Sequence, residues 1–160
     1  MAMLDISSYK MELLRDIFNS PVIVDAIESQ NENVDINSPD TLLYTHLFPY
    51  LKIPDTQTSN ECYILLACDS VNPNKANKFF KDMRITFWVF CSSDRMRIKG
   101  KNSTRIDYIA QELERLFIGQ TKYGFGELEL VSNRELIYDP KYQYRELIFR
   151  TIDVSKYICN

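Results

Sequence analysis

The stretch that decides the fold is Thr104 to Gly119, TRIDYIAQELERLFIG. Its apolar residues recur at steps of three and four, which places them on one stripe of an α-helix. Thr104 and Asp107 have the spacing of a capping box, with Asp in place of Glu or Gln, and Gly119 can end the helix. The stripe comprises Ile106, Ile109, Ala110, Leu113, Leu116 and Phe117, and the polar face comprises Arg105, Asp107, Gln111, Glu112, Glu114 and Arg115.

Strand-like runs lie on both sides of this helix. Residues 61–69 and 84–92 precede it, and residues 127–139 and 143–154 follow it. Both faces of the 61–69 run are apolar, so we expect a central strand covered on both sides. Asp139-Pro140-Lys141 predicts a turn that makes a hairpin of the last two strands. One helix between two pairs of strands most simply covers one face of a single sheet.

The N-terminal part of the chain has a different pattern. Residues 7–19 and 22–29 predict two helices, because the cap and proline of Asn19-Ser20-Pro21 start the second one. Residues 30–40 predict a loop. Residues 41–50 are apolar and aromatic but short and interrupted by Pro49, and the next residues, 51–54, predict an extended segment at the sheet edge. The Lys- and Asn-rich residues 70–83 predict an exposed excursion.

These patterns together predict the fold class α+β. We expect a single, mainly antiparallel sheet of about four strands, with the helix 104–119 packed on one face and helices at the N-terminus. The length favours one domain over residues 1–160. Within it, residues 1–40 form a helical region and loop, and residues 41–160 form the sheet and its helix.

Composition excludes several classes of protein. Hydrophobic residues make up 45% and charged residues 26%, an ordinary globular balance, and the net charge of -3 gives no reason to expect nucleic-acid binding. No apolar run approaches the roughly eighteen residues of a membrane span. Without a signal peptide we expect a cytoplasmic protein with reduced cysteines. A bridge from Cys91 to Cys62 or Cys68 remains conceivable.

No pattern predicts catalysis, a cofactor or a metal site. His46 is the single histidine, and such a residue is more often packed than catalytic. The cysteine spacings match no zinc site, and no nucleophile elbow is present. Gly124 and Gly126 follow a helix, whereas a dinucleotide-binding motif precedes one, so they are expected to permit a turn. Glu127 and Glu129 alternate with leucines, which indicates a strand with one wet face.

The most informative polar feature is a basic loop. Five positive charges fall within eleven residues: Arg95, Arg97, Lys99, Lys101 and Arg105. Such a run can simply keep a loop solvated. It can also contact an acidic partner, either a neighbouring protein or a nucleic-acid backbone. With only Met96 and Ile98 as apolar anchors, we expect the loop to be mobile in the isolated subunit.

Four phrases resemble a known family. They are LFPYLKIPDTQT at 47–58, RITFWVFCSSD at 84–94, GKNSTRIDYIAQELERLFIG at 100–119 and LELVSNRELIYDPKYQYRELIFRTID at 128–153. Their order of strand, basic loop, Arg-Ile-Asp helix start and tyrosine-rich hairpin resembles the tail-terminator, or tail-completion, proteins of tailed-bacteriophage necks. The resemblance spans most of residues 41–154 and assigns no individual interface residue.

The resemblance implies a structural subunit and no enzyme. Such subunits assemble into a ring, usually hexameric, that caps the tail tube and joins it to the head connector. The implied partners are further copies of the chain, the tail tube protein and the head connector or stopper. DNA would only pass through the lumen, and the protein would reside in the virion after assembly in the host cytoplasm. The basic loop differs from the negatively charged lumen expected of such a ring.

Other functions remain open at this stage. A head-completion or connector protein of the same neck is a related structural alternative. A small cytoplasmic enzyme with a scattered site, or a monomeric module that binds through the basic loop, belongs to a different class.

Overall fold

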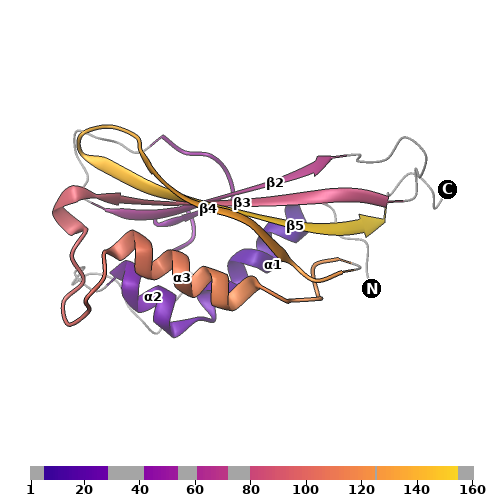
Figure 1. Ribbon diagram of the computed structural model, residues 1–160, viewed down its shortest axis with the longest axis horizontal. Helices are drawn as coiled ribbons and strands as arrows, with labels where there is room; N and C mark the ends of the chain where they lie inside the picture. The colour runs from indigo at the N-terminus through magenta and orange to yellow at the C-terminus, as the bar shows by residue number, and fades with distance from the viewer. Residues whose placement is uncertain (1–5, 29–41, 54–60, 72–79, 125, 155–160) are drawn as a thin grey trace.

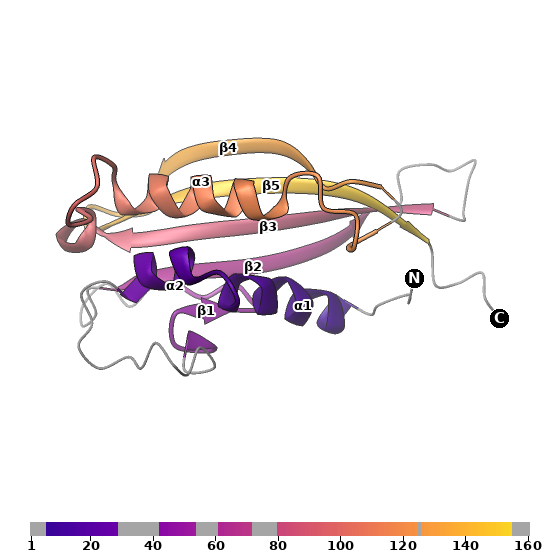
Figure 2. The same cartoon turned by 90° about the horizontal axis from the view of Figure 1, so that it is seen from below.

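The computed structural model describes residues 6–28, 42–53, 61–71, 80–124 and 126–154. Helices α1, α2 and α3 lie on one face of a single sheet (Figures 1 and 2), which confirms the α+β class. The elements in chain order are α1 (Ile6–Phe18), α2 (Pro21–Glu28), β1 (Leu47–Phe48), β2 (Cys62–Val71), β3 (Phe80–Ser92), the 3₁₀ turn η2 (Ser93–Arg95), α3 (Arg105–Phe117), β4 (Glu129–Ile137) and β5 (Tyr142–Val154). None of these helices is long and apolar enough to cross a membrane.

The sheet has five strands in the order β1-β2-β3-β5-β4. β1 runs parallel to β2, and every other pair is antiparallel. The strand beyond the expected four is the two-residue β1, which lies in the apolar run 41–50 and not in residues 51–54, where the sequence predicted the extended segment at the sheet edge. The central strand is β3, whereas β2, expected to be central, is next to this short edge strand.

The prediction of an exposed excursion over residues 70–83 was wrong at both ends. β2 continues to Val71, and β3 begins at Phe80, where it pairs with Val154. A charged residue can stand in this part of β3 because it has a partner on the neighbouring strand: Asp82 Oδ2 lies 3.6 Å from Arg150 Nε. Residues 72–79, like the loop predicted over 30–40, fall outside the described residues.

Helix α3 follows its sequence pattern closely. The Thr104 hydroxyl accepts a hydrogen bond from the Asp107 N–H at 3.3 Å, and Gly119 has a φ of 77°, so both predicted helix ends are confirmed. Five of the six stripe residues are buried, and Leu116 is partly buried. The Phe117 ring stacks on Phe87 of the sheet at 5.1 Å between centroids. The helix therefore joins the sheet through the stripe that the sequence predicts.

The two N-terminal helices complete the same core. Leu13, Leu14 and Ile17 of α1 are fully buried, as expected from their spacing. Met11 was assigned to this apolar face but is 36% exposed, and Tyr9 is buried there instead. The Tyr9 ring lies 5.9 Å from that of Tyr123, a residue that follows α3.

The opposite face of the sheet carries a second cluster of mainly aromatic residues. Its buried members are Phe48, Tyr63, Leu65, Phe90 and Tyr142, with Trp88 and Tyr144 packed against them. No described helix covers this face, since α1, α2 and α3 all lie on the other side of the sheet (Figure 1). Part of it is covered by the residues after β1, where Lys52 Nζ lies 4.4 Å from the centroid of the Phe48 ring.

Of the two glycines between α3 and β4, only Gly124 is required by close packing. A Cβ atom on Gly124 would lie 2.6 Å from the backbone oxygen of Ile152, whereas a Cβ on Gly126 would meet nothing within 4 Å. Gly124 therefore allows this segment to approach β5 closely. The predicted hairpin of β4 and β5 is confirmed, with Asp139 Oδ1 accepting the N–H of Lys141 at 2.8 Å and of Tyr142 at 2.6 Å.

Candidate functional site

The basic loop leaves the sheet at the end of β3 and is tied to a neighbouring turn. The Ser93 N–H and hydroxyl both donate to the carbonyl of Lys141, at 2.8 and 2.9 Å. Further along, Arg97 forms an isolated antiparallel bridge with Thr104, and Gly100 takes a φ of 78° between them. The loop is thus closed at its base, with its tip turned back toward the start of α3.

Arg105 is the internal anchor of this loop. Its guanidinium donates to the carbonyls of Arg95 at 2.7 Å, Arg97 at 3.3 Å and, from helix α2, Ala26. The backbone N–H of Arg105 donates to the Met96 carbonyl at 2.7 Å. Hydrogen bonds from a charged group to carbonyls inside a protein are strong, and losing the donor leaves those carbonyls unsatisfied.

The position of Arg105 corrects one sequence-based expectation. It was placed on the polar face of the helix and among the partner-binding residues, yet its side chain is only 1% exposed. The reason is that its acceptors come from the loop and from α2, which the helical pattern cannot reveal. Ile98 is also buried at 5% exposure, and together with the Arg105 hydrogen bonds it anchors the loop more firmly than the sequence, which predicted a mobile loop with Met96 and Ile98 as its only anchors, implied.

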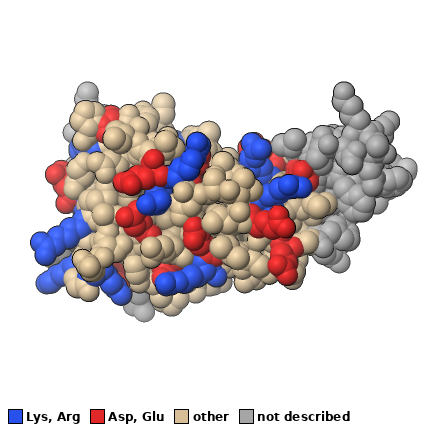
Figure 3. Space-filling view, in the orientation of Figure 1, with Lys and Arg blue, Asp and Glu red and all other residues tan. Residues whose placement is uncertain are grey.

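The other four basic residues differ in exposure. Arg95 is half-buried, whereas Arg97, Lys99 and Lys101 are exposed. Positive side chains gather at the end of the molecule where this loop lies (Figure 3). Lys101 Nζ lies 5.0 Å above the Tyr108 ring, a cation–π contact that steadies the tip. The loop therefore presents three cations to solvent from a fixed base.

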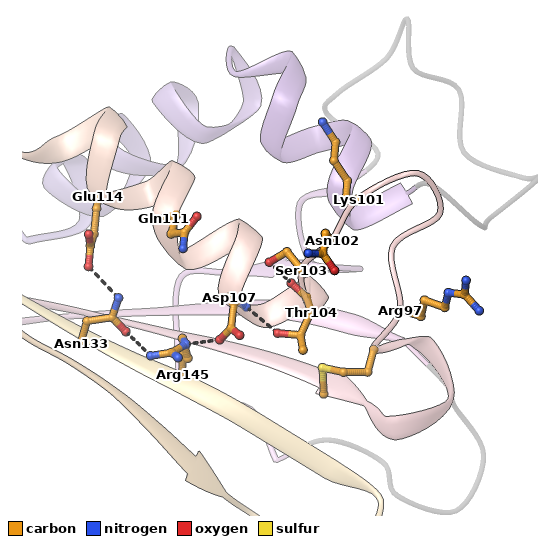
Figure 4. Close-up of a pocket in the computed structure, with 11 residues that line it drawn as sticks. Arg97, Lys101, Asn102, Ser103, Thr104, Asp107, Gln111, Glu114, Asn133 and Arg145 are labelled. Carbon is orange, nitrogen blue, oxygen red and sulfur yellow. Dashed lines mark hydrogen bonds and ion pairs between the residues drawn. The ribbon is translucent and has the colours of Figure 1, made fainter.

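A polar pocket of about 980 Å³ lies beside the loop, between α3 and the strands β4 and β5. Arg145 joins two of the residues that line it, with Nε paired to Asp107 and Nη1 donating to Asn133 Oδ1 at 3.0 Å. Asn133 in turn donates to Glu114 at 2.6 Å, while Arg97 and Lys101 extend away from this network (Figure 4). The lining residues are Met96, Arg97, Lys101, Asn102, Ser103, Thr104, Asp107, Gln111, Glu114, Asn133 and Arg145.

The polar groups that line the pocket are largely bonded to one another. Its two carboxylates are engaged by Arg145 and Asn133, and the hydroxyl of Thr104 accepts the Asp107 N–H. Its lining includes no His or Cys that could serve as a general base or nucleophile. Among the described residues, no group of three or more His, Cys, Asp or Glu could hold a metal ion.

His46 lies away from this pocket and is packed, as its sequence context suggests. Its side chain is 6% exposed, and its ring lies 6.3 Å from that of Tyr63. Burial lowers the pKa of His46. Glu61, 3.9 Å away, opposes that shift, and the cations Arg95 and Lys52 add to it. Burial therefore favours the neutral imidazole over the charged one.

An apolar groove of about 270 Å³ occupies the helix-free face of the sheet. Its walls include Trp88, whose indole N–H donates to Glu146 at 3.1 Å, and the exposed residues Leu51 and Ile53. The remaining lining residues are Lys52, Leu65, Phe90, Tyr138 and Tyr144. Exposed apolar surface of this kind is typical of protein contacts.

Sequence reasoning missed the Arg145 network and this groove. The signal for the groove was present, because Trp88 and Phe90 alternate along one strand as Tyr142 and Tyr144 do along another. What the sequence does not give is the pairing that places Phe90 directly opposite Tyr144.

Comparisons with known proteins give one family. No curated protein matches the chain. Residues 20–151 match the YomW family, and this range includes the basic loop, all five strands except the last residues of β5, and the helices α2 and α3. Because the match covers most of the sequence, the chain belongs to the YomW family, a phage-derived, Bacillus prophage-like protein family.

Proposed function

We propose that this protein is a structural subunit of a phage neck: a tail terminator that forms a ring, caps the tail tube and joins it to the head connector. Membership of a phage-derived family supports the broader statement that this is a phage protein. The resemblance of four phrases to tail terminators supports the specific role. The protein would be a component of the virion with no catalytic activity, and DNA would only pass through its ring.

The observation that carries the proposal is the basic loop on its fixed base. Arg97, Lys99 and Lys101 are exposed, while buried Arg105 and Ile98 hold the backbone beneath them. A preformed loop loses little conformational entropy when it docks, so more of its contact energy remains for binding. Its charges fit an acidic surface on a neighbouring copy, the tail tube protein or the connector.

The helix-free face of the sheet supports the same reading. It offers exposed apolar side chains, including Leu51 at 63% and Ile53 at 75% exposure, on a side away from the helices. A ring subunit needs two different surfaces, because each copy contacts the next one head to tail. The basic loop and the apolar groove are separate surfaces of the subunit, and in a ring each would meet a different complementary surface on a neighbour.

The proposal is tested by deleting the gene from an inducible prophage and viewing the products by electron microscopy. We expect tails of irregular, extended length that carry no heads, and recovery of normal particles when the protein is supplied from a plasmid. Tails of normal length attached to heads without the protein would contradict the proposal. Tails of normal length that remain separate from filled heads would instead identify a head-completion protein.

A further inference from the structure

Two buried cysteines face each other across neighbouring strands. Cys62 of β2 and Cys91 of β3 are direct partners in the antiparallel register. Both belong to the core under the helices, at 1% and 0% exposure, and both are free thiols. Cys68 on the same side of β2 is also free and buried, but its partner across the strands is Ile85.

The position of this pair in the ladder brings the side chains close together. The Ser92 N–H donates to the Glu61 carbonyl at 3.3 Å, so residues 61 and 92 form a hydrogen-bonded pair. Hydrogen-bonded and non-hydrogen-bonded pairs alternate along an antiparallel ladder, which makes Cys62 and Cys91 a non-hydrogen-bonded pair. The Cα separation typical of such pairs, about 4.5 Å, falls within the range that disulfides span.

The two thiols also differ chemically in a way that favours reaction between them. A hydrogen bond between the two side chains lowers the pKa of Cys91, burial opposes that shift, and the nearby Arg105 and Arg95 add to the lowering. The same hydrogen bond, together with burial, raises the pKa of Cys62. Cys91 is therefore the better nucleophile of the pair, since the thiolate is the reactive form.

We propose that Cys62 and Cys91 are a redox-active pair that forms a reversible disulfide when local opening of the strand ends admits hydrogen peroxide to the buried thiols. The Cys91 thiolate attacks one peroxide oxygen, the O–O bond breaks, and the products are a Cys91 sulfenic acid and, after protonation, water. The Cys62 sulfur then attacks the sulfenic sulfur, the S–O bond breaks, and a second water leaves with the Cys62 proton. One peroxide is reduced to two waters, and two thiols are oxidised to one disulfide.

The bond would form where the basic loop leaves the sheet. Cys91 precedes Ser92, the N-cap of η2, and its thiol lies 3.4 Å from the Ser92 carbonyl oxygen. Linking it to β2 would fix the strand end on which the loop is mounted. A cross-link also restricts the unfolded chain, so oxidation should raise the melting temperature. The inference is independent of the tail-terminator role, because it depends only on the core of the subunit.

The test treats the full-length reduced protein with hydrogen peroxide, followed by alkylation in denaturant and peptide mapping without reductant. We expect the loss of two alkylatable thiols, a peptide joining Cys62 to Cys91, and a melting temperature raised by several degrees that dithiothreitol restores. Cys91→Ser should abolish the cross-link, whereas Cys68→Ser, which removes a buried thiol paired with Ile85 across the strands, should keep it.

Two results would overturn the inference. One is recovery of both thiols in reduced form after a peroxide treatment that fully oxidises free cysteine. The other is a disulfide that joins Cys68 or Cys159 in preference to the Cys62–Cys91 pair. If Cys91→Ser fails to fold, Cys62→Ala is the second variant and should also lack the cross-link. The peptide map of the oxidised wild-type protein shows whether the Cys62–Cys91 disulfide forms, whatever the outcome for either variant.

Discussion

At the scale of single residues, Arg105 shows how a charge can serve the fold. Its guanidinium joins the loop carbonyls of Arg95 and Arg97 to the carbonyl of Ala26, a residue 79 positions earlier in the chain. Sequence periodicity places it on the helix but cannot reveal acceptors so far away. Its burial could not be predicted for that reason, whereas the exposure of Arg97, Lys99 and Lys101 agrees with their charge.

Replacing Arg105 with Met should destabilise the protein by about 3 kcal/mol, because buried carbonyls lose their charged donor. Thermal or denaturant unfolding measures the change. Arg97→Met is the matched control, since Arg97 is exposed and its replacement should change stability by less than about 0.5 kcal/mol. Equal effects of the two substitutions would show that Arg105 is not an anchor.

His46 gives a second prediction, on pH. Its pKa lies below the ordinary value of 6.5 in the folded protein, chiefly through burial, so the unfolded chain binds the proton more readily. The contribution of His46 to the free energy of unfolding is therefore fully present above pH 6.5, and it is lost as the pH falls toward the pKa of His46 in the folded protein. The melting temperature of the wild type should therefore fall more steeply below pH 6.5 than that of His46→Gln. Parallel curves for the two proteins would contradict this assignment.

At the scale of elements, helix α3 is the part of the fold that the sequence determines best. Its stripe and both ends could be predicted because a helix is built from contacts three and four residues apart. Strand limits could not be predicted equally well, because they depend on distant partners. The start of β3 at Phe80 is set by pairing with the end of β5, and the charged residues around it gave no local sign of a strand.

Leu113→Asp tests the packing of α3 on the sheet. Leu113 is fully buried, so the substitution places an unpaired charge in the core and should cost several kcal/mol. Gln111→Asp adds the same charge to an exposed position of the same helix and should have a small effect. If the unfolding curves show the Leu113→Asp variant to be as stable as the wild type, the packing of α3 on the sheet through Leu113 is refuted.

Gly124→Ala tests the close approach between the segment after α3 and strand β5. A Cβ there would lie 2.6 Å from the Ile152 carbonyl oxygen, which is backbone and cannot move freely. We expect a loss of about 1–3 kcal/mol in unfolding free energy. Gly126→Ala, two positions later in open space, should leave stability nearly unchanged. A tolerated alanine at position 124 would mean that the two segments lie further apart.

At the scale of the whole molecule, the sheet separates two environments. One face is sealed by three helices, and the other carries the aromatic cluster and the apolar groove. The fold class followed from the order of helical and strand patterns along the chain. The groove and the Arg145 network did not, because each is assembled from strands that are distant in sequence and adjacent only after pairing.

The central claim is that the basic loop docks the subunit in a phage particle, and it can be tested with one triple variant. Arg97, Lys99 and Lys101 are replaced together by Ser, and incorporation into particles is measured in a prophage lacking the wild-type gene. A control replaces three other exposed cations, Arg84, Arg115 and Lys122, by Ser, which changes the net charge equally. Both variants should melt close to the wild type, since each alters exposed side chains.

The deciding measurement is the amount of each variant bound to purified tails, over a range of salt concentrations. We predict that the loop variant binds poorly at low salt, where charge contacts are strongest, while the control variant binds like the wild type. Binding of the wild type should also weaken as salt rises. Wild-type levels of the loop variant on tails, at low and high salt alike, would contradict the account and leave the loop as a solvated surface.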